Sequence, residues 1–180
     1  MPQLRVLFTQ EEIRSTVGRL AREISRDYEG KNPLLIGVLK GAVIFMADLM
    51  RLLDMPLEVE FVRLSSYGRG KVSSGKVRVV RGLLRLPIKD RDILVIEGIV
   101  DTGITLDFLL GWLRRKRPAS LRVCALFDKA MCRKVSVPID YLGLSVPNEF
   151  VVGYGVDWDE KFRNLPGLYV LEEENQPQGA

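Results

Sequence analysis

Short apolar runs alternate with helical segments along this chain, and this alternation constrains its fold more than any other feature. Residues 34–38 (LLIGV) and 92–96 (DILVI) have the length and apolar content of buried strands. Each is followed by a segment with apolar residues at helical spacing, over 42–53 and 105–116, and 121–127 (LRVCALF) is a third strand candidate. Strand–helix–strand units predict an α/β protein with a mostly parallel, twisted sheet flanked by helices. In such sheets, ligands bind beyond the carboxyl ends of the strands.

Further elements are expected around this centre. Thr9 and Glu12 have the spacing of a capping box, which predicts a helix over residues 10–27. Strands over 58–64 and 77–81 predict a hairpin with a long, mobile tip at residues 65–77. Short apolar segments at 141–144, 150–155 and 168–171 complete the chain.

Composition excludes several classes of function. The chain has 180 residues, which fits one domain, and it has no histidine, so a Ser-His-Asp triad or an imidazole base is excluded. Acid–base chemistry must use carboxylates, lysines, tyrosines or cysteines. Cys124 and Cys132 do not have a metal or redox spacing. The apolar runs are too short for a membrane helix and the N-terminus lacks a signal-peptide pattern, so we expect a cytoplasmic protein that does not bind a membrane.

The positive charge of the chain is concentrated in one region. Residues 63–91 carry nine Lys or Arg and the single acid Asp90, whereas the whole chain has a net charge of +4. Such a region suits anionic partners, either phosphorylated small molecules or nucleic acid. A solvated hairpin whose edge carries protective cations is an equally good interpretation.

The segment that follows the strand at 92–96 combines two acids with a glycine and two threonines. Thr102, Gly103 and Thr105 open a helix, whose free N–H groups and added hydroxyls can bind a phosphate monoester. Glu97 and Asp101 would repel that phosphate, so they suit sugar hydroxyls, a Mg²⁺ held through waters, or a proton transfer. The spacing is not that of a Walker loop or a G-x-G-x-x-G fingerprint. A turn with a threonine cap and no ligand is the alternative.

Several motifs, in order, carry a family resemblance. The sequence of residues 96–106, IEGIVDTGITL, closely resembles the phosphoribosyl pyrophosphate (PRPP) signature of type I phosphoribosyltransferases. Residues 39–41 (LKG), 65–67 (SSY), 127–129 (FDK) and 150–157 (FVVGYGVD) are similar to segments of bacterial hypoxanthine(-guanine) phosphoribosyltransferases. The resemblance covers residues 5–171 and implies the type I fold. It implies one domain over 1–180, with a core at about 30–145, a hood from the N-terminal residues and about 146–175, and a flexible hairpin loop.

The resemblance implies a purine-salvage transferase. Ribose 5-phosphate would pass from PRPP to N9 of hypoxanthine and/or guanine, giving IMP or GMP and pyrophosphate. Thr102, Gly103 and Thr105, with the amides of Asp101 and Ile104, would hold the 5′-phosphate. Asp101 would be the catalytic residue, exchanging a proton with N7 of the purine, and Glu97 would hold the ribose hydroxyls.

The pyrophosphate and purine positions also follow from the resemblance. Lys40 and Gly41, in a turn with a cis peptide between Leu39 and Lys40, would bind pyrophosphate together with Arg163. Asp157 and Glu97 would hold Mg²⁺, largely through waters. The purine would meet the remaining residues: Lys129 at O6, Phe150 by stacking, the backbone of Val151 at the base edge, and Asp157 nearby. Ser66 and Tyr67 would open the flexible loop that closes over the site, and Trp158 would pack in the hood.

The sequence departs from the family pattern at one position, and two alternative functions stay open. Many relatives have a second acid after the first, where this chain has Gly98, so we expect Gly98→Asp to be tolerated and to change Mg²⁺ or PRPP dependence. An RNA-binding regulator on the same fold is one alternative, motivated by the basic region, although we expect no nucleic-acid partner. A transferase specific for xanthine or another base is the other. The family forms homodimers and homotetramers, and we expect either here.

Overall fold

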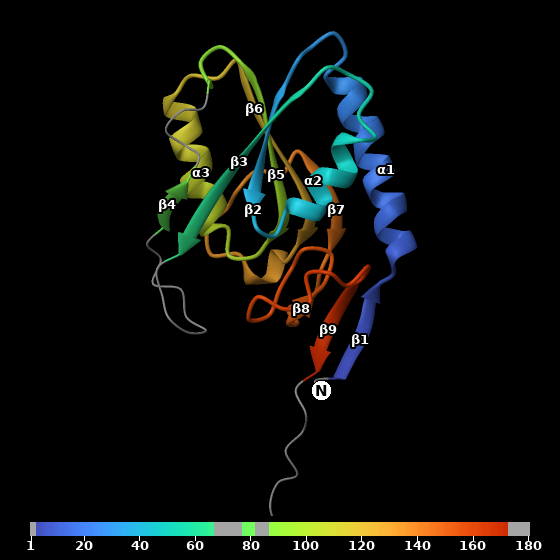
Figure 1. Cartoon of the computed structure of the whole chain (residues 1–180). Helices are drawn as coiled ribbons and strands as arrows, with labels where there is room; N and C mark the ends of the chain where they lie inside the picture. The colour runs from blue at the N-terminus through green and yellow to red at the C-terminus, as the bar shows by residue number, and fades with distance from the viewer. Residues whose placement is uncertain (1–2, 67–76, 82–86, 173–180) are drawn as a thin grey trace, which may run out of the picture.

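The computed structural model describes residues 3–66, 77–81 and 87–172, and its centre is a six-stranded sheet (Figure 1). The strand order is β4-β3-β2-β5-β6-β7. All neighbours are parallel except β3 and β4, which form the expected antiparallel hairpin pair. The strands are β2 (Leu34–Leu39), β3 (Glu58–Ser66), β4 (Val77–Arg81), β5 (Asp92–Val100), β6 (Ser120–Asp128) and β7 (Tyr141–Ser145). The predicted α/β class with a mostly parallel sheet is confirmed.

Three helices cover the two faces of this sheet. In Figure 1, α3 (Ile104–Arg115) lies on one side of it, and α1 (Gln10–Asp27) and α2 (Val43–Met50) lie on the other. Successive strand residues point to opposite faces. Leu35 therefore packs into the core beneath α1 and α2, while Ile36 packs into the core beneath α3. None of the helices in the described ranges is long and apolar enough to cross a membrane.

The first helix begins and ends where the sequence predicts. The Thr9 hydroxyl accepts from the Glu12 amide at 3.3 Å, and the Glu12 carboxylate accepts from the Thr9 amide at 2.8 Å, which completes the capping box. The second helix is shorter than the predicted 42–53. It ends at Met50, because the Leu52 amide turns back to the Leu49 carbonyl at 2.9 Å in a tighter turn.

A small antiparallel sheet lies below the carboxyl ends of the parallel strands in Figure 1. Its order is β1-β9-β8, with β1 at Gln3–Phe8, β8 at Val151–Val152 and β9 at Leu168–Glu172. The strand β1 was not expected from the sequence, which shows no clean alternation there. Its pairing with β9, in the register Arg5↔Val170, brings both ends of the described chain into the hood.

The strand β5 extends further than predicted. The sequence predicts a strand over 92–96 only, but residues 97–100 continue the strand beside β6, in the pairs Glu97↔Ala125 and Ile99↔Phe127. The prediction was wrong because β6 runs alongside as far as Asp128 and supplies hydrogen-bond partners. The turn is thereby confined to residues 101–103, directly before α3.

Candidate active site

A cavity of about 200 Å³ lies at the carboxyl ends of β2 and β5 and the start of α3. This is the edge of the sheet at which ligands of parallel sheets bind. The cavity brings together the two acids and most of the phosphate-binding residues that the sequence predicted. Its lining comprises Val38, Leu39, Leu64, Glu97, Ile99, Val100, Asp101, Thr102, Gly103, Thr105 and Leu106. Ile104 does not line it, although its amide lies at the first position of α3.

The N-terminus of α3 has the geometry of an anion site. Gly103 precedes the helix with φ of 83°, a left-handed conformation that favours glycine. An added Cβ there would lie 2.4 Å from the carbonyl oxygen of Val135, so only glycine fits. No side chain caps the helix start, and the Thr102 hydroxyl lies 3.5 Å from the Ile104 amide. These amides and hydroxyls can therefore donate to a phosphate.

Three residues that no sequence motif indicates, Arg133, Lys134 and Val135, support this turn. Arg133 Nη1 donates to the Asp101 carbonyl at 2.9 Å, and Arg133 Nη2 pairs with Asp128 at the end of β6. The amides of Lys134 and Val135 donate to the Thr102 carbonyl at 2.9 and 3.1 Å. The Asp101 side chain is left exposed beside the cavity, while its main chain is fixed. A lone Arg133 carries no sequence signal of this role.

Glu97 is the acid most affected by its surroundings. Burial raises the pKa of its carboxyl to about 8, and the N–H groups of Gly98 and Ile99 oppose this shift. The Gly98 amide donates to Glu97 Oε1 at 3.1 Å. A carboxyl of this kind is protonated near neutral pH in the free protein, and a bound cation or hydroxyl donor would favour its charged form.

We expect Glu97→Gln to stabilise the protein at high pH only. The folded-state pKa of about 8 exceeds the usual 4.5, so the folded chain binds more protons and wild-type stability falls as pH rises through that interval. The variant cannot ionise, so its free energy of unfolding should exceed that of the wild type by about 1–3 kcal/mol at pH 9 and by far less at pH 4.5. Thermal unfolding at both pH values measures this. If the free energies of unfolding of the two proteins depended on pH in the same way, the raised pKa of Glu97 would be contradicted.

Lys129 lies inside the protein rather than on its surface. The residue is 9% exposed, and its amide donates to the Val100 carbonyl at 2.9 Å. Lys129 is not paired with its neighbour Asp128, because Asp128 pairs with Arg133. Within the described ranges, Lys129 forms no ion pair. Its ammonium is therefore available to a polar group of a ligand.

Phe150 and Val151 present a side chain and a backbone edge in the hood. Phe150 is 52% exposed, which rules out a core role, and its carbonyl accepts from the Leu171 amide at 2.8 Å. Val151 is buried in β8. Trp158, expected to pack in the hood, lies against Phe162 with ring centroids 6.3 Å apart.

The two cations expected to bind pyrophosphate meet at one carboxylate. The peptide between Leu39 and Lys40 is cis, as the resemblance implied. Lys40 Nζ lies 2.7 Å from Glu160 Oε2, and Arg163 Nη2 lies 3.2 Å from the same oxygen. Arg163 also contacts Asp157 Oδ1 at 2.7 Å and donates from Nη1 to the Gly155 carbonyl at 2.7 Å. Lys40 and, more weakly, Arg163 lower the pKa of Glu160. No sequence motif indicates this role of Glu160.

Two glycines, Gly98 and Gly155, allow the main chain of the Lys40 turn to pack closely against them. A Cβ at Gly98 would lie 2.6 Å from the Gly41 carbonyl oxygen and 2.8 Å from its carbon, and one at Gly155 would lie 2.4 Å from the same oxygen. These distances argue against the expectation that Gly98→Asp is tolerated, because a side chain there must displace backbone. Gly98 stands where many relatives have a second acid. Its backbone is also the surface against which the Lys40 turn packs.

The acids present fit a Mg²⁺ that shares its ligands with a substrate. Among the described residues, no three acidic, histidine or cysteine side chains form a metal-binding group. Asp157 already accepts from Arg163 and from the Glu160 amide at 2.9 Å. Mg²⁺ is commonly held by one or two carboxylates, waters and substrate phosphates, and such a site needs no protein cluster.

Two predicted residues fall at or beyond the edge of the described structure. Ser66 ends β3, where its Cα pairs with that of Val77. Tyr67 and the rest of the expected flexible loop lie outside the described residues, so their role stays a prediction.

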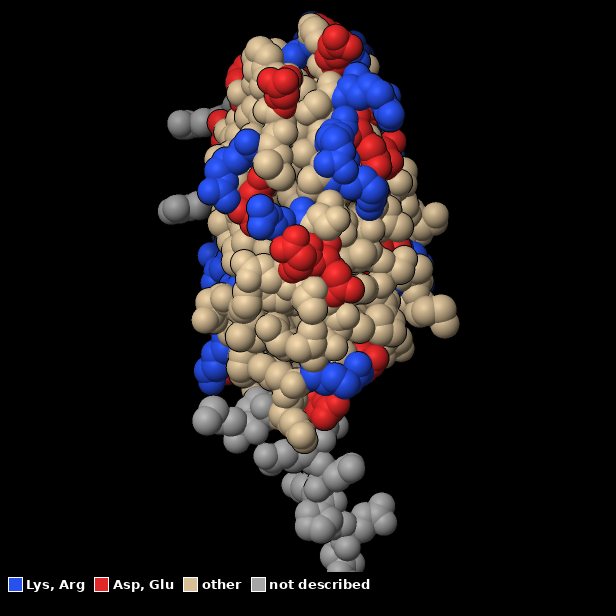
Figure 2. All heavy atoms as spheres, turned by 90° about the vertical axis from the view of Figure 1, so that its right-hand side faces the viewer, with Lys and Arg blue, Asp and Glu red and all other residues tan. Residues whose placement is uncertain are grey.

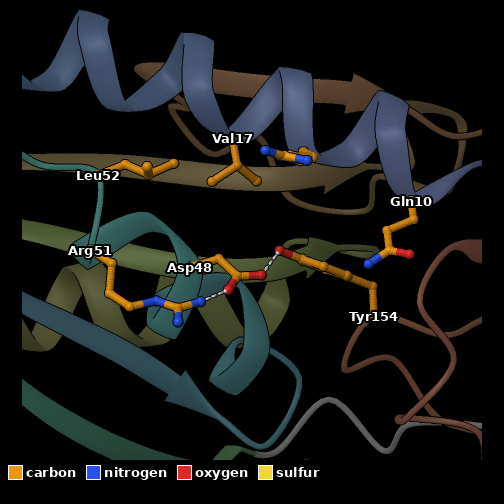
Figure 3. Close-up of a pocket in the computed structure, with 7 residues that line it drawn as sticks. Gln10, Val17, Asp48, Arg51, Leu52 and Tyr154 are labelled. Carbon is orange, nitrogen blue, oxygen red and sulfur yellow. Dashed lines mark hydrogen bonds and ion pairs between the residues drawn. The ribbon is translucent and has the colours of Figure 1, made fainter.

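A larger pocket of about 510 Å³ lies between α1 and α2 and contains none of the predicted site residues (Figure 3). The Tyr154 hydroxyl donates to Asp48 Oδ2 at 2.5 Å, and Asp48 also pairs with Arg51. Burial and the Asp48 carboxylate raise the pKa of Tyr154 far above its usual range. Because Tyr154 precedes Gly155, this bond ties α2 to the hood loop beside the Lys40 turn.

Comparison with known proteins finds relatives that match this chain over most of its length. The model of the phosphoribosyl transferase domain family matches residues 7–159. The chain is 46% identical over 170 residues to the hypoxanthine-guanine phosphoribosyltransferase of Streptococcus thermophilus, covering 94% of each. It is 44% identical to the bifunctional protein TilS/HprT of Listeria innocua, of which it spans 26%. A crystal structure of a Staphylococcus aureus hypoxanthine phosphoribosyltransferase matches with a TM-score of 0.88 at 38% identity, covering 93% of this chain and 91% of that one.

Proposed function

The chain belongs to the phosphoribosyltransferase family, and from this membership we propose that it is a purine-salvage enzyme of the hypoxanthine-guanine kind. It transfers ribose 5-phosphate from PRPP to N9 of hypoxanthine, guanine or both, and releases pyrophosphate. One observation carries the proposal. The cavity at the carboxyl ends of the strands joins an anion-binding helix start to two carboxylates.

The phosphate and the ribose occupy the β5–α3 end of the site. The amides from Asp101 to Ile104 and the hydroxyls of Thr102 and Thr105 donate to the 5′-phosphate. Glu97 accepts from the ribose hydroxyls. Because β5 and the Arg133 contacts fix the main chain, this end of the substrate is bound by preorganised donors.

The base lies between β6 and the hood. Asp101 accepts or returns the proton at N7 of the purine, a role that accelerates a reaction by about 10²–10⁴-fold. Lys129 donates to O6, Phe150 stacks on the ring, and the backbone of Val151 meets the base edge. A donor at O6 favours oxopurines over adenine, whose 6-position is itself a donor.

The pyrophosphate leaves from the opposite end, where Lys40, Gly41 and Arg163 contact it. Asp157 and Glu97 would hold a Mg²⁺ together with this group, and the ion would supply positive charge that offsets part of the charge of the pyrophosphate. Arg163 is already positioned by Gly155 and Asp157, so it meets the leaving group without rearrangement.

An absorbance assay with PRPP and Mg²⁺, run separately on hypoxanthine, guanine, xanthine and adenine, tests the proposal. Turnover of hypoxanthine or guanine, but not of adenine, is the expected result. Turnover of xanthine alone would identify the base-specific alternative. No turnover by a folded protein, with steeply salt-dependent RNA binding, would favour the regulator.

We expect Lys129→Ala to damage purine binding selectively. The loss of a charged donor should raise KM for hypoxanthine by about 10- to 100-fold, while KM for PRPP changes by about 2-fold or less. Steady-state kinetics with each substrate varied in turn measures both constants. Lys134→Ala is the matched control, because Lys134 is an exposed lysine in the same segment. Equal changes in the two constants would contradict the O6 role.

We also propose a homodimer or homotetramer that works in the cytoplasm and binds no nucleic acid. The helix α2 and the turn after it leave apolar side chains exposed, which suit contact with a second copy: Val43 (42%), Met50 (38%) and Leu52 (53%). On the face drawn in Figure 2, basic and acidic side chains are interspersed. A mixed face of this kind does not attract a polyanion. Light scattering after size-exclusion chromatography measures the oligomeric state.

A further inference from the structure

Glu160 occupies the space between the two cations of the pyrophosphate subsite. Its Oε2 lies 2.7 Å from Lys40 Nζ and 3.2 Å from Arg163 Nη2, so one carboxylate oxygen serves both. The Glu160 side chain is 62% exposed, whereas that of Arg163 is 22% exposed. The carboxylate therefore lies on the solvent side of Arg163, and it occupies one side of Lys40, whose side chain is 41% exposed.

The two cations depend on Glu160 to different extents. Arg163 is held by the Gly155 carbonyl and by Asp157, each at 2.7 Å, and keeps its position without Glu160. Lys40 has Glu160 as its only ion-pair partner within the described ranges. The backbone of Glu160 is anchored separately, since its amide donates to Asp157 Oδ2 at 2.9 Å. The Glu160 side chain can therefore leave while the loop that carries it stays in place.

A pyrophosphate group cannot share these cations with Glu160 without repulsion. It carries several negative charges, and like charges in contact raise each other's energy. We propose that Glu160 is an internal counter-ion that occupies the pyrophosphate subsite in the free protein, is displaced by the pyrophosphate group of PRPP, and returns as pyrophosphate leaves. Glu160 is thus a positioning residue that weakens pyrophosphate binding and promotes release. This inference rests on the proposed function.

The test compares Glu160→Gln with Asp159→Asn in the full-length protein. Both variants remove one negative charge from the same loop, but Asp159 contacts Lys161 at 3.8 Å and neither subsite cation. Both positions have positive φ, 62° and 50°, and each substitution keeps the shape of the side chain. Calorimetric titration with inorganic pyrophosphate and excess Mg²⁺ gives the dissociation constant of each protein.

We expect Glu160→Gln to bind pyrophosphate about 2- to 5-fold more tightly than wild type, the range that loss of a surface ion pair allows. Asp159→Asn should match wild type. KM for PRPP should fall in Glu160→Gln, while the affinity for IMP, which lacks the pyrophosphate group, should be unchanged. Weaker or unchanged pyrophosphate binding by Glu160→Gln would overturn the inference, as would an equal gain in Asp159→Asn.

These outcomes are distinct from failure of the proposed function. If the wild-type protein binds neither PRPP nor pyrophosphate, the function itself is wrong and the role of Glu160 is wrong with it. If the wild-type protein binds and turns over PRPP but Glu160→Gln leaves pyrophosphate affinity unchanged, only the counter-ion role is lost.

Discussion

Replacing Asp101 with Asn lowers kcat by about 10²–10⁴-fold and leaves the fold intact: this is the largest effect we expect from a single substitution. The amide keeps the size of the carboxylate but cannot accept a proton. The fold uses the main chain of Asp101, whose carbonyl binds Arg133, and leaves its side chain exposed. The melting temperature of the variant should therefore stay close to that of the wild type. Steady-state assays with hypoxanthine and thermal unfolding measure the two quantities.

Asp107→Asn is the matched control for this prediction. Asp107 is an exposed acid in the first turn of α3, six residues further along, and it does not line the cavity. Its loss should weaken the helix start by less than about 1 kcal/mol and change kcat little. Comparable losses of kcat in both variants would mean that charge near the helix start, rather than proton transfer, accounts for the effect.

Gly98→Ala should destabilise the protein by about 1–3 kcal/mol and raise KM for PRPP at least about tenfold. The new methyl group would lie 2.6 Å from the Gly41 carbonyl oxygen, so β5 and the Lys40 turn must separate. Lys40 and Gly41 then lose their placement against the pyrophosphate group. Denaturant titration and PRPP kinetics measure the two effects.

Gly111→Ala provides the comparison for Gly98. Gly111 lies within α3, and the nearest atom to an added Cβ is the flexible guanidinium of Arg115 at 4.0 Å. Alanine there should be neutral or stabilising by up to about 1 kcal/mol, because it favours the helix. A Gly98→Ala protein with wild-type stability and wild-type PRPP kinetics would show that the turn adjusts freely.

The elements that depend on local chemistry were predictable from the sequence. The capping box set the start of α1, and the apolar run at 92–96 located β5. The end of β5 was missed, because the apolar run stops at Ile96 while pairing with β6 extends the strand to Val100. The strand β1 was also missed because it depends on a distant segment. Its partner β9 lies more than 160 residues away in the sequence and supplies its hydrogen bonds.

The residues of the candidate site show the same difference. Some follow from a local motif, and others depend on contacts between distant parts of the chain. Glu97, Asp101 and the start of α3 lie close together in the sequence, so one motif predicts them together. Glu160 contacts Lys40 across 120 residues of sequence, and Arg133 contacts the carbonyl of Asp101 across 32. Neither contact leaves a local pattern. The steric role of Gly98 was equally hidden, because the sequence shows a missing carboxylate but not the Gly41 backbone that fills its place.

The hood segment from Phe150 to Arg163 has a consequence for how base preference could evolve or be engineered. The segment carries residues assigned to the incoming base at one end and residues assigned to the departing pyrophosphate at the other. Its backbone is joined internally, since the Gly155 amide donates to the Arg163 carbonyl at 2.9 Å and Arg163 returns a bond to Gly155. A substitution that reshapes the base end would be transmitted to the leaving-group end. We therefore expect new base preferences to cost less rate when mutations are made near Lys129, directly after β6, than when they are made in the hood.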